Sequence, residues 1–171
     1  FEVQAADIDE QARPGEAPRA LAERLAREKA GAVAARVGAA PRRVVLGADT
    51  IVVVDGDVLG KPADAADAMR LLGRLVGRAH EVLTGVALVA SDAPSIAQTR
   101  VVASRVVMRR ASEDEIRRYV ATGEPLDKAG AYAAQGEGRR FIEAIHGSET
   151  NVIGLPMDET LALLRAAGHS A

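Results

Sequence analysis

Apolar runs typical of strands alternate with segments of helical period along this chain, and this alternation most constrains what it can fold into. Apolar residues at every fourth position predict a helix over residues 17–37, and an apolar stripe at helical spacing predicts a second over residues 62–77. Near-continuous apolar runs predict buried strands over residues 43–54 and 80–90. A tight turn at residues 55–57 returns the first of these strands through residues 58–59.

The second half of the chain continues the alternation. A turn at residues 91–95 leads to a long hairpin partner over 96–108, and Ser112 with Glu115 forms a capping-box pair that starts a third helix ending near Gly123. A glycine-rich stretch, two strands and a last helix follow at residues 123–138, 140–145, 151–155 and 156–167. Because two connections are hairpin-like, we expect an α/β fold in which helices flank a mixed β-sheet.

Composition excludes several classes of function. The 171 residues include no cysteine, which rules out disulfides, thiolate metal sites and a cysteine nucleophile. With a formal charge of −2 and 2% aromatic residues, the chain is not expected to bind nucleic acid. Neither a membrane-spanning apolar stretch nor a secretory signal is visible, so no membrane partner is expected and the expected location is cytoplasmic.

Asp49 interrupts the apolar run at residues 44–54. An ionised carboxylate inside such a strand is costly unless a cation, a hydrogen-bond donor or a metal offsets its desolvation. Perturbed carboxylates gather at functional sites, whereas a strand-edge aspartate bonded to nearby backbone is the alternative. Asp49 is therefore a candidate site residue with both interpretations open.

Lysine is scarce in this chain. Among its 22 basic residues, only Lys29, Lys61 and Lys128 are lysines. Lys29 falls on the apolar side of the first predicted helix, so its ammonium either reaches water past its neighbours or meets a carboxylate or phosphate. Lys61 precedes a proline and a predicted helix N-terminus, where anions bind, and an exposed loop lysine is the alternative. Lys128 is either a site residue or the partner of the adjacent Asp127 in a turn.

Two polar segments offer further candidate ligands. The acidic opening of the chain, which includes Glu10, is either a solvated face or the source of a hard oxygen ligand for Mg²⁺. The segment through Gln135 combines flexible backbone with an amide that can read the edge of a base. Motifs with well-known spacing are absent from the sequence, since it has no Walker loop, no Gly-x-Gly-x-x-Gly after the first strand and no Gly-x-Ser-x-Gly elbow.

Eight short segments, taken in order, resemble the Maf family of nucleoside triphosphate pyrophosphatases, also known as septum-formation inhibitor proteins. They are Asp9-Glu10, Arg27-Glu28-Lys29-Ala30, Gly47-Ala48-Asp49-Thr50, Gly60-Lys61-Pro62, the segments 80–86 and 123–132, Gln135-Gly136, and Gly154-Leu155-Pro156. Within the family, residues 127–132 and the Gln135-Gly136 pair are similar to the branch that acts on dTTP and UTP rather than the branch that acts on 7-methyl-GTP.

The resemblance implies hydrolysis between the α and β phosphates of a nucleoside triphosphate, assisted by a divalent metal, Mg²⁺ or Mn²⁺. It also implies a two-lobed fold with a central nucleotide cleft. Asp49 would be the proton acceptor that activates water and, with Glu10, a metal ligand. Thr50 and Gln135 would take part in selecting the base, and the three lysines would bind the substrate.

One feature departs from the family pattern. Members begin with a strand and a Ser-x-Ser-Pro-Arg-Arg loop that grips phosphate, and this chain starts at Phe1, after the place where that loop is expected. Pro41-Arg42-Arg43 does not replace it, because alanines precede it where serines belong. We expect a single Maf-like domain over residues 1–171 that lacks this strand and loop, and whether the natural protein carries them stays open.

Three functions remain to be distinguished. The first is a pyrophosphatase acting on dTTP and UTP, with a nucleoside triphosphate as its partner. The second is a nucleotide-binding regulator of septum formation with little or no turnover. The third keeps the fold and acts on modified nucleotides. Whether the chain forms a homodimer stays open.

Overall fold

The computed structural model describes residues 1–94 and 97–169. The chain divides into two compact units. The first unit contains Phe1–Asp49, Thr84–Val102 and the chain from Gly154 onward, and the second contains Thr50–Leu83 and Ala103–Ile153. This division agrees with the two-lobed arrangement that the family resemblance implies.

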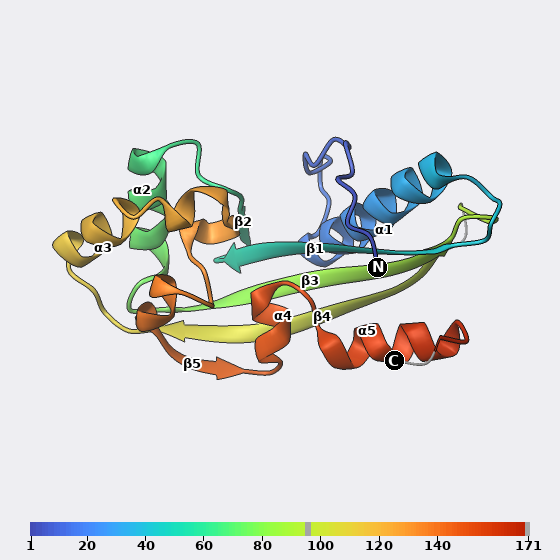
Figure 1. The fold of residues 1–171 in the computed structure, drawn as a ribbon. Helices are drawn as coiled ribbons and strands as arrows, with labels where there is room; N and C mark the ends of the chain where they lie inside the picture. Colours follow the sequence, from blue (N-terminus) through green and yellow to red (C-terminus); the bar gives the residue numbers. More distant parts are fainter. Residues whose placement is uncertain (95–96, 170–171) are drawn as a thin grey trace. The chain divides into compact units, whose positions relative to one another are not determined.

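Up to His146, helices and strands follow one another in the order that the sequence predicts (Figure 1). The α-helices are α1 (Pro18–Val37), α2 (Ala65–Leu75), α3 (Glu113–Val120), α4 (Glu149–Ile153) and α5 (Met157–Ala166). The strands are β1 (Val44–Val54), β2 (Asp57–Leu59), β3 (Ala79–Ala90), β4 (Ala97–Met108) and β5 (Ile142–His146). The glycine-rich stretch folds into three short 3₁₀ helices, η1 (Glu124–Asp127), η2 (Ala129–Ala131) and η3 (Glu137–Phe141). No helix among the described residues combines the length and apolar content needed to cross a bilayer.

The five strands form one sheet in the order β2-β1-β3-β4-β5. β1 pairs antiparallel with β2, and β4 pairs antiparallel with β5. The Ser91 N–H, just after β3, donates to the carbonyl of Arg43, just before β1, so these two strands also run in opposite directions. The α/β fold with helices beside a sheet is confirmed, but the sheet is antiparallel where a mixed sheet was expected. The reason is that β3 pairs with β1 in the opposite direction, so that the end of β3 lies beside the start of β1.

In the first unit, α1 and α5 cover opposite faces of the strands (Figure 1). The α1 face is built from small side chains, with Ala26, Ala30 and Ala34 packed on Ala87 and Val89. On the other face, Leu163 of α5 packs on Val86 and Leu88. Small residues on α1 let the helix backbone come close to the sheet.

The second unit has its own apolar core, to which α2, α3 and the ends of β1, β3 and β4 contribute. The rings of Tyr119 and Phe141 lie edge to face, with centroids 5.3 Å apart, and both side chains are fully buried. The predicted capping box is confirmed: Ser112 accepts from the Glu115 N–H, and the Glu115 carboxylate accepts from the Ser112 N–H.

One predicted strand is wrong. Residues 149–153, which overlap the strand expected at 151–155, form the short helix α4. Ser148 Oγ accepts the Asn151 N–H at 3.1 Å, and the fully buried Asn151 amide donates to Ser104 Oγ and to the Val82 carbonyl. These contacts favour a helical turn over an extended strand. Two residues of the predicted 91–108 hairpin, Ser95 and Ile96, lie outside the described residues.

Candidate functional site

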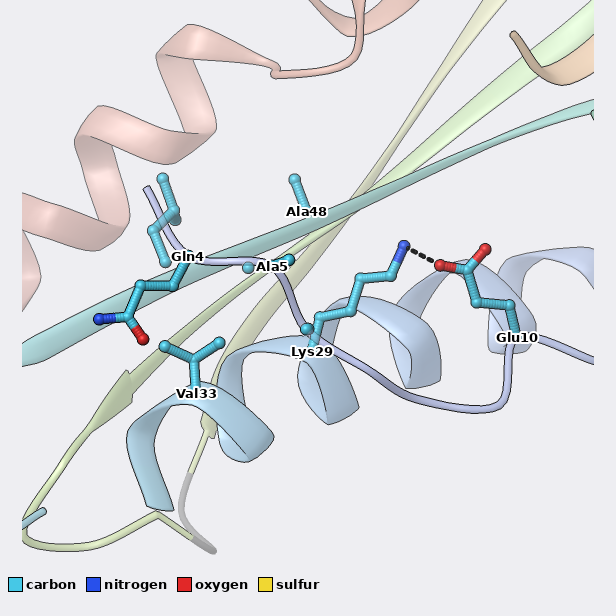
Figure 2. Close-up of a pocket in the computed structure, with 9 residues that line it drawn as sticks. Gln4, Ala5, Glu10, Lys29, Val33 and Ala48 are labelled. Carbon is cyan, nitrogen blue, oxygen red and sulfur yellow. Dashed lines mark ion pairs between the residues drawn. The ribbon is translucent and has the colours of Figure 1, made fainter. Parts of the chain in front are cut away.

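Lys29 joins two carboxylates in the first unit. Its Nζ lies 2.6 Å from Asp49 Oδ1 and 2.7 Å from Glu10 Oε1. Asp49 is buried in β1 with 8% of its side chain exposed, whereas Glu10 belongs to the N-terminal segment and is half exposed. Figure 2 shows Lys29 extending from α1 with its ammonium directed at Glu10. The ion pair answers both open questions from the sequence: Asp49 has a cationic partner, and Lys29 meets carboxylates.

A glycine explains how α1 comes close enough to β1 for this contact. A Cβ on Gly47 would lie 2.5 Å from the Ala26 carbonyl oxygen and 2.8 Å from the Ala30 nitrogen, both on α1. Gly47 and Asp49 are two residues apart on the strand and so face the same side. The close approach at Gly47 therefore sets the distance that Lys29, one residue before Ala30, must span to reach Asp49.

The electrostatic balance favours a charged ammonium. Burial acts to lower the pKa of Lys29, but the hydrogen bonds to Asp49 and Glu10 outweigh it and leave the pKa above its usual value. Lys29 is thus a fixed cation between two oxygen ligands. Such a group can hold a phosphate as readily as a carboxylate.

A hollow of about 310 Å³ opens beside this ion pair. It is lined by Gln4, Ala5, Ala6, Glu10, Lys29, Val33, Leu46, Gly47 and Ala48. In Figure 2, Gln4 and Ala5 of the N-terminal segment lie across from Lys29 and Val33 of α1. The first unit therefore presents a charged pair in the wall of an open pocket.

Arg24 of α1 anchors the N-terminal segment that carries Glu10. Its guanidinium binds both Glu16 oxygens at 2.7 and 2.8 Å, Glu28 at 2.9 Å and the Gln11 carbonyl at 2.9 Å. The hydrogen bond from Arg24 is the largest cause that lowers the pKa of Glu16 to about 2. The sequence did not predict a role for this buried arginine. Its one local indication was the i,i+4 spacing between Arg24 and Glu28.

The other two candidate lysines lie in the second unit. Lys61 is exposed in the loop before α2, whose N-cap is Asp64. The hydrogen bond from Lys128 is the main cause of the lowered pKa of Asp127, and the charge of Lys61 adds to it. Lys128 Nζ lies 2.7 Å from the carboxylate of the adjacent Asp127, so Lys128 forms the ion pair that was one of its two interpretations from the sequence. The Gly130 N–H donates to the Gly60 carbonyl at 3.0 Å, so the two lysine-bearing loops are joined.

The two candidate base-selecting residues take different positions. Thr50 follows Asp49 on β1 and is half-buried, and Gln135 is exposed in the loop between η2 and η3. Within the second unit, the Gln135 loop is tied to Glu124 and Tyr119, two residues that the sequence analysis did not single out. Their partners lie 13 or 14 residues away in the chain, so no local pattern could have revealed them.

Among residues 1–94 and 97–169, no group of three or more His, Asp or Glu side chains is placed to hold a metal ion. Glu10 and Asp49 nevertheless offer two carboxylates within hydrogen-bond distance of one nitrogen. Mg²⁺ is typically bound through one or two carboxylates together with substrate phosphates. The donor set therefore fits a metal that arrives with a phosphorylated ligand better than a metal held by protein alone.

Comparison with known proteins places the chain among close relatives. A family model described as Maf-like protein matches residues 1–167. A dTTP/UTP pyrophosphatase of Anaeromyxobacter dehalogenans (strain 2CP-C) is 53% identical over 169 residues, which cover 98% of this chain and 84% of that protein. Proteins of the same name from Hahella chejuensis and Symbiobacterium thermophilum are 51% and 50% identical, covering 98% and 99% of this chain and 82% and 84% of their own lengths.

Proposed function

This chain belongs to the Maf-like protein family, and on that premise we propose that it hydrolyses dTTP and UTP to the nucleoside monophosphate and pyrophosphate. The observation that carries the proposal is the Glu10–Lys29 pair in the wall of a pocket, with the buried Asp49 bound to the same ammonium. A buried carboxylate held beside a fixed ammonium suits a reaction in which a proton leaves water while negative charge builds on phosphate.

In the proposed reaction, a water oxygen attacks the α-phosphorus and passes its proton to Asp49. The bond between the α-phosphorus and the oxygen that bridges to the β-phosphorus breaks, and pyrophosphate leaves with that bonding pair. Lys29 stays protonated and stabilises the phosphate oxygens, and Lys61 and Lys128 also bind the substrate. Thr50 and Gln135 contact the base.

Glu10 and Asp49 would hold the divalent cation, Mg²⁺ or Mn²⁺. When bound, this metal would neutralise charge on the phosphates and orient them. The fit rests on the two carboxylates that share the Lys29 ammonium.

The test is release of pyrophosphate and monophosphate from a panel of nucleoside triphosphates with added Mg²⁺. Turnover should be highest for dTTP and UTP, and Asp49→Asn should lower kcat by about 10²–10⁴-fold because a positioned base is lost. Asp92→Asn is the matched control, since Asp92 is an exposed aspartate of the same unit that pairs with Arg42. Its kcat should equal that of the unchanged protein.

The outcomes separate the competing functions. Nucleotide binding without monophosphate would favour a regulator with little turnover over an enzyme. Faster turnover of modified nucleotides than of dTTP or UTP would change the substrate and keep the reaction. Unchanged kcat in Asp49→Asn would show that another group accepts the proton.

A further inference from the structure

The loop that presents Gln135 is held on both sides of that residue. Before it, the Ala133 N–H donates to Tyr119 Oη at 3.1 Å. After it, the Glu137 N–H donates to Glu124 Oε1 at 3.0 Å, and the Gly138 N–H donates to Glu124 Oε2 at 2.9 Å. The exposed Gln135 side chain therefore projects from a backbone whose two flanks are fixed.

The Glu124 carboxylate that makes two of these contacts is itself fixed. It begins η1, and the fully buried Tyr119 is one of the groups that lower its pKa. Burial acts to raise the pKa of Glu124, but the hydrogen bonds from Tyr119 and from the two backbone N–H groups outweigh it and the pKa is lowered. Glu124 is thus a charged acceptor that uses both oxygens on neighbouring backbone donors, the stronger kind of hydrogen bond.

Two glycines after Gln135 allow the loop to approach this carboxylate. Gly136 has a φ of +96°, and a Cβ there would meet Glu124 Oε1. A Cβ on Gly138 would lie 2.5 Å from the Ala133 carbonyl oxygen. At Gly136 the backbone lies against the Glu124 side chain, and at Gly138 it lies against Ala133 and Tyr119, so neither position has space for a larger residue.

A fixed loop matters because an amide alone does not discriminate among pyrimidines. The Gln side chain carries both a donor and an acceptor. Thymine and uracil present an acceptor at O4, whereas cytosine presents an amino donor at the same position. A mobile glutamine can rotate its amide to satisfy either base, so discrimination requires that its place be held.

We infer that Glu124, itself held by Tyr119, is a positioning residue that fixes Gln135 and thereby sets the preference for uracil and thymine over cytosine. This inference rests on the proposed function, because it assigns base contact to Gln135. Glu124 does not touch the reacting phosphates in this account; it acts through the backbone of residues 133–138.

The experiment measures kcat/KM for UTP and CTP in Glu124→Gln and Tyr119→Phe. Glutamine places an NH₂ group against one of the two backbone donors, so one anchoring bond is lost, and Phe removes only the hydroxyl from a well-packed ring. The UTP:CTP ratio should fall about tenfold in Glu124→Gln, as expected for one lost hydrogen bond, with the change mainly in KM. Tyr119→Phe should shift the ratio less, in the same direction. Glu143→Gln, an exposed glutamate on β5, should leave it unchanged.

A Gln135→Ala background shows whether Glu124 acts through Gln135. In that background Glu124→Gln should not alter the UTP:CTP ratio further. Two results would overturn the inference. One is that Glu124→Gln lowers the UTP:CTP ratio equally with and without Gln135. The other is that the ratio is unchanged in both Glu124→Gln and Tyr119→Phe. If the unchanged protein turns over neither nucleotide, the proposed function fails, and calorimetric binding of UTP and CTP to the same variants then decides the role of Glu124 separately.

Discussion

At Lys29 a single ammonium neutralises two carboxylates, one buried in a strand and one on the N-terminal segment. Removing the cation leaves Asp49 desolvated without its charged partner, which costs more than the pair contributes when intact. The residue thus has a structural role that is separable from any role in turnover.

We expect Lys29→Met to lower the free energy of unfolding by about 1–3 kcal/mol, the usual cost of an unsatisfied buried polar group. The cost should be smaller in an Asp49→Asn background, where no buried charge is left behind. Urea unfolding of the two single variants and the double variant measures this coupling. Additive effects would show that the two side chains do not interact in solution.

The same variant tests whether the two carboxylates can hold a divalent cation. In the unchanged protein the Lys29 ammonium occupies the space between Glu10 and Asp49. Without it, the two carboxylates lose the cation that they share and should take up Mg²⁺ more readily, so Mg²⁺ should raise the Tm of Lys29→Met more than that of the unchanged protein. Arg42→Met removes an exposed cation, and Mg²⁺ should raise its Tm only as much as it raises the Tm of the unchanged protein. Equal Mg²⁺ shifts in all three proteins would show that the Lys29 ammonium does not keep Mg²⁺ away from these two carboxylates.

At the scale of elements, two glycines that look alike in the sequence have opposite roles. Gly47 lies where β1 meets the backbone of α1, and a Cβ there has no room. Gly73 is exposed inside α2, and a Cβ there would meet nothing within 4 Å. Only the first is required by packing.

Gly47→Ala should therefore destabilise the protein and lower turnover, because α1 must move away from β1 and carry Lys29 away from Asp49. Gly73→Ala should raise the free energy of unfolding by about 0.5–1 kcal/mol, since alanine loses less entropy in a helix. Thermal unfolding together with kcat for both variants checks this pair. A Gly47→Ala protein with wild-type Tm and kcat would show that the close approach does not position the site.

The sequence predicts elements well where a pattern is local. Residues 17–37 follow a four-residue apolar repeat, and α1 spans Pro18–Val37. The strand expected at 151–155 is instead the helix α4, because its conformation depends on Asn151 reaching Ser104, 47 residues away. In the site, scarcity of lysine and a charge inside an apolar run indicated Lys29 and Asp49. Glu124 acts through contacts 13 and 14 residues away, which no local pattern encodes, and only one of the contacts of Arg24, that to Glu28, follows a local spacing.

Over the whole molecule, acid affects stability in two pH ranges that overlap only slightly. The pKa values of Glu16 and Glu115 are each lowered to about 2, mainly by hydrogen bonds from Arg24 and from the Ser112 backbone. Because these carboxylates bind protons less readily when folded, their contribution is present above about pH 4.5 and is lost as the pH falls toward 2. His80 acts at higher pH, since burial lowers its pKa to about 4 from an ordinary value of 6.5.

His80 is buried in the second unit, where Nε2 shares a 2.8 Å hydrogen bond with the Tyr132 hydroxyl and Nδ1 has no partner among the described residues. Between pH 6.5 and 4 the unfolded chain binds a proton at this position that the folded protein does not. Stability must therefore fall as the pH drops through this range, by about 3 kcal/mol in total.

His80→Gln removes the titrating group and keeps an amide that can bond to Tyr132. Urea unfolding between pH 7 and 3 should show a steady fall in unfolding free energy for the unchanged protein from pH 6.5 downward. The variant should stay level until about pH 4.5 and fall only where the carboxylates protonate. His146→Gln, at an exposed position on β5, should keep the wild-type slope. If His80→Gln loses stability between pH 6.5 and 4.5 as steeply as the unchanged protein, the buried imidazole does not bear the acid sensitivity, because no proton can bind at that position in the variant.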